Sequence, residues 1–123
     1  MSKKILVIDD EASVCSMLKK FLEMKGYAAD IAVSGQEGID RVRQNAPAIV
    51  LLDIRMPGMD GVEVLKEIKR IDKNVNVIMI TAVNENEIGK KCIELGAYDY
   101  IIKPFDLEYL ENALLVKLFD IND

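Results

Sequence analysis

Five side chains that could act together on a charged ligand lie at the ends of short apolar runs: Asp9, Asp10, Asp53, Thr81 and Lys103. A short apolar run closed by turn residues is typical of a strand that is buried on both faces. The carboxyl ends of such strands meet at one edge of an open parallel sheet, and ligands bind at that edge. We therefore expect these five side chains to converge.

The three carboxylates of this group would repel one another unless a cation lay between them. Hard divalent cations prefer oxygen ligands, and Mg²⁺ commonly takes one or two carboxylates and keeps several waters. Lys103 adds a positive charge, Thr81 a hydroxyl and Ala82 a backbone N–H. These groups could neutralise and orient a phosphoryl group while Asp53 attacks it to form an acyl phosphate. The plainer interpretation is a set of helix caps with a structural Lys–Asp pair.

Strand patterns and helix patterns alternate along the chain. The apolar residues Val14, Leu18 and Phe21 have the spacing of a helix with one buried face, and Gly26 is placed to end it. The same reasoning predicts strands at 4–8, 28–33, 49–53, 75–81 and 98–102, each followed by a helix. Residues 120–123 are expected to form a frayed tail or the start of a linker.

This alternation predicts an α/β fold, a parallel sheet with helices on both faces and right-handed crossovers. If the strand order reverses at the first strand, that strand lies in the centre of the sheet. Asp9, Asp10 and Asp53 then become neighbours at the switch point.

Composition narrows the class of protein. The 123 residues suffice for one domain, and a net charge of −5 gives no sign of direct nucleic-acid binding. No apolar run is long enough for a signal peptide or a membrane span, so we expect a cytoplasmic protein. Cys15 and Cys92 fall at apolar positions of helical patterns and are expected in the core. The sequence has no histidine, so it cannot carry a phosphohistidine itself.

Four motifs resemble those of the receiver domain of two-component response regulators, over essentially the whole chain. They are Asp9-Asp10-Glu11, the segment 53–61 (DIRMPGMDG), Thr81-Ala82 and Lys103-Pro104-Phe105. The resemblance implies a (βα)5 doubly wound, flavodoxin-like fold with the strand order 2-1-3-4-5. It also implies a single receiver domain over residues 1–123, either stand-alone or excised from a longer regulator.

The resemblance assigns roles to the acidic cluster. Asp53 is similar to the phosphoacceptor of the family. Asp10 and Asp53 resemble the direct ligands of Mg²⁺ (or Mn²⁺), with the backbone carbonyl of Arg55 as a third ligand. Asp9 would act through a metal-bound water. The protein would thus be a phosphoacceptor regulatory domain rather than an enzyme with a separate substrate.

The resemblance also implies a switch. Thr81 and Lys103 would close on the phosphoryl group, and Tyr100 would rotate inward into the space that Thr81 vacates. This would remodel the face formed by the fourth helix, the fifth strand and the fifth helix, through which a homodimer is possible. The alternative for Tyr100 is an ordinary strand aromatic that packs against the last helix.

The phosphoryl donor implied is a sensor histidine kinase or a phosphotransfer protein that docks near the first helix, or a small acyl phosphate. The segment 96–106 most resembles receivers attached to transcriptional activators of the nitrogen-regulator type. Arg55 and Val83 lie two residues after Asp53 and Thr81, where they would flank the path of an attacking water. A long arginine and an apolar valine should hinder in-line attack by water, so we expect slow autodephosphorylation.

Three other functions share part of this pattern. A dehalogenase-type phosphatase would need a second acid two residues after Asp53, where Arg55 stands. A flavodoxin-like carrier would place the phosphate of its cofactor after the first strand, where Asp9-Asp10-Glu11 would repel it. A receiver-like scaffold that never accepts phosphate would share the fold.

Overall fold

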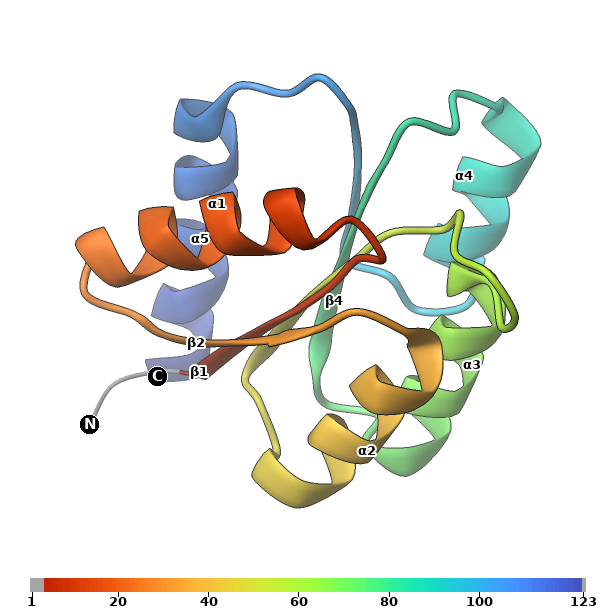
Figure 1. Cartoon of the computed structure of the whole chain (residues 1–123), viewed down its shortest axis with the longest axis horizontal. Coiled ribbons are helices and arrows are strands. Elements are labelled where there is room, and N and C mark those ends of the chain that lie inside the picture. Colours follow the sequence, from red (N-terminus) through yellow and green to blue (C-terminus); the bar gives the residue numbers. More distant parts are fainter. Residues whose placement is uncertain (1–3, 123) are drawn as a thin grey trace.

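The computed structural model describes the backbone of residues 4–122 and the side chains of residues 4–114 (Figure 1). Its five strands form one parallel sheet in the order β2-β1-β3-β4-β5, which confirms the predicted topology. The strands are β1 (Lys4–Ile8), β2 (Ala28–Ala32), β3 (Ile49–Leu52), β4 (Asn76–Thr81) and β5 (Asp99–Ile102).

Five helices connect and follow the strands: α1 (Ala12–Met24), α2 (Gly35–Asn45), α3 (Gly61–Ile71), α4 (Asn86–Glu94) and α5 (Leu107–Asn122). The expected strands 28–33, 49–53, 75–81 and 98–102 were each one residue too long. The expectation of a frayed tail was wrong for residues 120–122, because α5 continues through them. Residue 123 lies outside the described residues.

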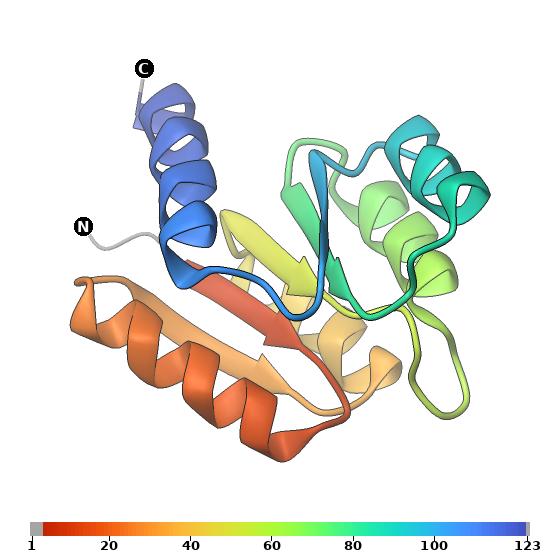
Figure 2. The ribbon, with the colours of Figure 1, turned by 90° about the horizontal axis from the view of Figure 1, so that it is seen from above.

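The helices cover the two faces of the sheet as separate layers (Figure 2). Helices α1 and α5 pack on one face, and their apolar side chains form a core with Ile5, Val7 and Ile78 of the strands. Helices α2, α3 and α4 pack on the other face, around Leu6 and Leu52. Every residue of β3 is buried, as expected for a central strand of a parallel sheet.

Strand register brings the ends of β1 and β3 together. Ile8 of β1 pairs with Leu52 of β3, so the next residues on the two strands, Asp9 and Asp53, leave the sheet side by side. The backbone N–H of Asp53 donates to the carbonyl of Ile8 at 3.0 Å. At the end of β4, the N–H of Lys103 donates to the carbonyl of Thr81 at 2.8 Å. The sheet therefore delivers all these residues to one edge.

Capping side chains define the start of α2 and of α3. The hydroxyl of Ser34 accepts from the N–H of Glu37 at 3.2 Å, and a carboxylate oxygen of Asp60 accepts from the N–H of Glu63 at 3.0 Å. At α4 the N-cap residue, Glu85, makes no such bond. Within the described part of the chain, no helix has the length and apolar character needed to cross a bilayer.

Candidate functional site

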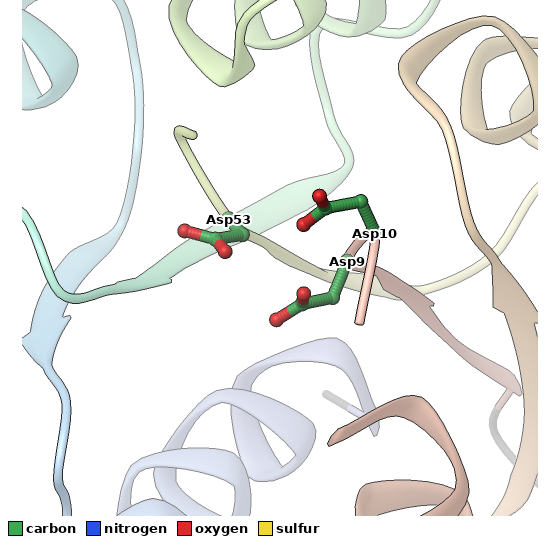
Figure 3. Close-up of side chains that lie close together, drawn as sticks. All are labelled: Asp9, Asp10 and Asp53. Atoms are coloured by element: carbon green, nitrogen blue, oxygen red, sulfur yellow. The ribbon is translucent and has the colours of Figure 1, made fainter. Parts of the chain in front are cut away.

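Three carboxylates meet beyond the ends of β1 and β3 (Figure 3). Asp9, Asp10 and Asp53 each place an oxygen within 4.8 Å of the others. Asp9 and Asp53 are only 3% and 6% exposed, whereas Asp10 is exposed to solvent. The predicted acidic cluster is thus brought together by the fold, with two of its members nearly removed from water.

Lys103 is the cation of this cluster. Its Nζ lies 2.7 Å from Oδ2 of Asp9 and 3.3 Å from Oδ2 of Asp53. Burial alone would lower the pKa of the ammonium, but the hydrogen bond that it donates to Asp9 and the charges of both carboxylates outweigh burial and raise that pKa. Lys103 is therefore held in its charged form, between the two buried acids.

Backbone donors hold the other oxygens of the buried carboxylates. Oδ1 of Asp9 accepts from the N–H of Glu11 at 2.9 Å, and Oδ1 of Asp53 accepts from the N–H of Ile54 at 2.7 Å. Bonds of this kind orient a carboxylate and lower the cost of burying its charge. The Lys–Asp pair predicted by the plainer interpretation is present, but it leaves Asp10 outside it.

The charge balance of the cluster fits a divalent cation. One ammonium faces three carboxylates, and among the described residues no side chain forms an ion pair with Asp10. An all-oxygen donor set with excess negative charge is what Mg²⁺ or Mn²⁺ prefers. Asp9, Asp10 and Asp53 are close enough together to hold such an ion, although Asp9 and Asp53 also contact Lys103.

Thr81 and Ala82 follow at the end of the neighbouring strand. Thr81 is fully buried, and its Oγ1 accepts from the N–H of Val83 at 3.2 Å. Ala82 is exposed and lines a groove of about 540 Å³ together with Lys103. The other lining residues are apolar side chains of α1, of the loop after β5 and of the first residue of α5: Val14, Met17, Pro104, Phe105 and Leu107. This groove opens directly beside the acidic cluster.

Tyr100 lies on the α4 side of the sheet. Its hydroxyl donates to the carbonyl of Val83 at 2.6 Å, and its ring packs against the core beneath α2, α3 and α4. Burial raises the pKa of this phenol, and Cys92, Glu85 and Asp53 raise it further. The alternative that Tyr100 packs against the last helix was wrong, because α5 covers the opposite face.

Arg55 and Val83 line a second groove, of about 520 Å³, which begins at the segment after β3. The guanidinium of Arg55 lies 3.8 Å from a carboxylate oxygen of Glu85, and both side chains are largely exposed. Val83 is 3% exposed. The two positions thus line one groove, in which Val83 contributes a buried wall and Arg55 an exposed side chain.

Two features of the site had no clear signal in the sequence. The Cys15 thiol, expected only as a core residue, donates to the carbonyl of Asp9 at 3.2 Å. Its burial and the nearby Asp9 raise the pKa of the thiol to about 11, so it stays protonated. Gly61 passes so close to the backbone of Asp53 that an added Cβ would lie 2.1 Å from the Asp53 carbonyl oxygen.

Comparisons with known proteins agree on one family. The model of the family described as the response regulator receiver domain matches residues 5–115. The chain is 39% identical over 114 residues to Sporulation initiation phosphotransferase F of Bacillus subtilis, which covers 93% of this chain and 92% of that protein. It is also 39% identical over 110 residues to Transcriptional regulatory protein ZraR of Escherichia coli, where it spans 25% of that protein. A crystal structure of a two-component response regulator from Clostridium difficile matches 99% of this chain and 100% of that chain, with a TM-score of 0.95 and 31% identity.

Proposed function

The chain belongs to the response regulator receiver domains, and from this we propose that it is a signalling switch operated by phosphorylation of Asp53. The observation that supports the proposal is the position of Lys103, whose ammonium contacts the buried carboxylates of Asp9 and Asp53 beside the exposed Asp10. Transfer of a phosphoryl group to a carboxylate requires a positioned nucleophile and fixed positive charge beside it. Asp53 and Lys103 supply these, and the exposed carboxylate of Asp10 lies next to them.

In this proposal a carboxylate oxygen of Asp53 attacks the phosphorus of the donor while the bond between phosphorus and the donor breaks. The group that leaves is the imidazole of the donor's phosphohistidine, or acetate when acetyl phosphate is the donor. The N–H of Ile54 holds Oδ1 in place, which leaves Oδ2, now beside Lys103, to form the new O–P bond. Lys103 then neutralises the oxygens of the transferred group, and the Ala82 N–H orients them. A bound Mg²⁺ or Mn²⁺ would add positive charge at the same oxygens.

We propose Thr81 and Tyr100 as the switch. The Thr81 hydroxyl, now an acceptor for Val83, would turn to donate to the phosphoryl group. Because Val83 also accepts the hydrogen bond from Tyr100, a movement of this segment reaches the Tyr100 ring directly. The surface of α4, β5 and α5 would then change for an output domain, a partner or a second copy of the chain.

The groove beside Lys103 supports the proposal that a partner protein delivers the phosphoryl group. Its walls are mostly apolar, and it leads to the acidic cluster. We propose that a sensor histidine kinase or a phosphotransfer protein docks there, in the cytoplasm, with its phosphohistidine facing Asp53. The relative ZraR is a transcriptional regulatory protein, which supports a similar output for this chain. The chain would act as a regulatory domain, with no substrate other than its own donor.

The proposal is tested by intact mass after incubation with acetyl phosphate, with and without Mg²⁺. We expect the wild type to gain one phosphoryl group only with Mg²⁺, and Asp53→Asn to gain none. Asp60→Asn is the matched control, because Asp60 lies in the same loop and asparagine caps a helix equally well. If no condition phosphorylates the wild type, a phosphate-independent binding module becomes the better interpretation.

Slow autodephosphorylation is a second expected result. Arg55 and Val83 line one groove together with Ile54, the residue after Asp53. We propose that water approaches Asp53 from this side, and that the long Arg55 and the apolar Val83 hinder its attack. We expect Arg55→Asn combined with Val83→Glu to speed the loss of the phosphoryl group about tenfold, which is a fall in the barrier of about 1.4 kcal/mol. The rate is measured by intact mass over time.

Because Val83 is buried, Arg55→Asn is also measured alone, and Arg43→Asn on the distant α2 serves as the control. An unchanged rate in both the single and the double variant would show that these side chains do not limit the reaction.

A further inference from the structure

Gly89 is the one glycine of the chain whose surroundings do not require glycine. Of the seven glycines, three have a positive φ and three have neighbours only 2.1–2.6 Å from an added Cβ. The first group is Gly26, Gly58 and Gly96, and the second is Gly35, Gly38 and Gly61. At Gly89 the nearest atoms to an added Cβ lie at 3.9 Å, an ordinary van der Waals distance. Alanine would therefore fit there.

Glycine in this place weakens α4. Gly89 lies in the interior of the helix, where glycine lowers the equilibrium constant for helix formation about fivefold relative to alanine. The helix already lacks a side-chain cap at Glu85, and Cys92 is its one buried residue. This glycine lowers helix stability and is not required by packing. The absence of a side chain at position 89 therefore suggests a functional role.

The atoms that face the missing side chain belong to Tyr100. An added Cβ would be equally far, 3.9 Å, from Cγ, Cδ1 and Cδ2 of that ring. It would thus stand over the middle of the ring face. We call this the seated position of Tyr100: the ring against Gly89, with the hydroxyl on the Val83 carbonyl. Beside it lies a groove of about 480 Å³, lined by Gly89, Tyr100 and Ile93 among others.

We infer that Gly89 is a positioning residue for Tyr100. Glycine at this position holds the seated ring weakly enough for the ring to leave. With glycine the ring has no methyl group above it, and the adjoining groove can receive it when the hydroxyl releases Val83. A methyl group at position 89 would contact the seated ring and narrow the opening from the seated position into the groove. The inference deepens the proposed function, because it rests on Tyr100 being the switch.

The test measures the position of the ring without any phosphorylation. The chain is labelled with 3-fluorotyrosine, and its four tyrosines give four ¹⁹F signals, of which Tyr100→Phe identifies one. We expect Gly89→Ala to lower the ratio of unseated to seated ring about threefold, the effect of burying one methyl group. The exchange between the two positions should slow accordingly. An unchanged Tyr100 signal would overturn the inference.

A matched variant separates ring contact from helix stability. Lys91→Gly lowers the helix propensity of α4 by a similar factor, but Lys91 is exposed and does not line the groove. We expect it to leave the Tyr100 signal in place. If Lys91→Gly moved that signal as much as Gly89→Ala does, helix stability alone would explain the effect and the inference would fail.

Binding of beryllofluoride, a mimic of the phosphoryl group, distinguishes this inference from the proposed function. If the seated ring belongs to the activated state, Gly89→Ala should tighten beryllofluoride binding by up to the same threefold, measured by calorimetry. The gain should vanish in a Tyr100→Leu background. A shifted ¹⁹F signal without a change in binding would leave the role of Gly89 standing and refute the Tyr100 switch.

Discussion

Replacing Gly61 with alanine is expected to destabilise the fold by about 3 kcal/mol or more. The new Cβ would lie 2.1 Å from the carbonyl oxygen of Asp53 and 2.6 Å from Cα of Ile54. Both are backbone atoms, so no side chain can rotate away to make room. The N–H of Gly61 also donates to the Ile54 carbonyl at 2.8 Å, which fixes the start of α3 against the end of β3. The measurement is the urea midpoint and slope of unfolding.

Gly58→Ala is the control for this prediction. Gly58 lies in the same loop and has φ +80, but no atom lies within 4 Å of its added Cβ. Alanine at this position should therefore destabilise the fold only through its left-handed backbone, by about 1–2 kcal/mol. Gly61→Ala within 1 kcal/mol of the wild type would mean that the loop can yield, and that Asp53 is held less firmly than the close approach suggests.

Replacing Lys103 with methionine should destabilise the protein by roughly 2–3 kcal/mol in EDTA. The change leaves two buried carboxylates without their cation and beside a third acid. Loss of one partner from a fully buried pair costs about 3–5 kcal/mol, and Lys103 keeps some contact with water, so a smaller effect is expected. Unfolding in urea with EDTA and then with Mg²⁺ measures it.

Adding Mg²⁺ should stabilise Lys103→Met more than the wild type, because the cluster then carries more uncompensated negative charge. Lys25→Met is the control. Lys25 forms an exposed ion pair with Glu111 at 3.1 Å, and pairs of that kind contribute at most about 1 kcal/mol. Equal loss of stability in both variants would show that the Lys103 contacts matter no more than a surface pair.

The sequence was informative where apolar patterns and chain connectivity decide the outcome. Apolar runs placed every strand to within one residue at either end, and the predicted topology alone brought Asp9 and Asp53 together. The acidic cluster followed from the same logic. These features depend on the order of elements along the chain, which a sequence displays directly.

What the sequence could not provide are distances between elements. Nothing in the segment after Asp53 marks Gly61 as a point of close approach, rather than one more turn residue. The shorter contact of Lys103 with Asp9 than with Asp53 depends on how two loops settle against each other. The partner of the Tyr100 ring could not be chosen either, because alternation in a strand does not say which helix covers each face.

The sheet divides the apolar interior into two cores that share no helix. A change at Leu22 of α1 alters packing on one side, and a change at Ile68 of α3 alters it on the other. Energetic effects add when two sites share no partner. Lineages of this protein could therefore exchange residues around α1, where we propose that a donor docks, without changing the packing on the side that holds Tyr100. Partner choice and signal readout would then be able to evolve separately.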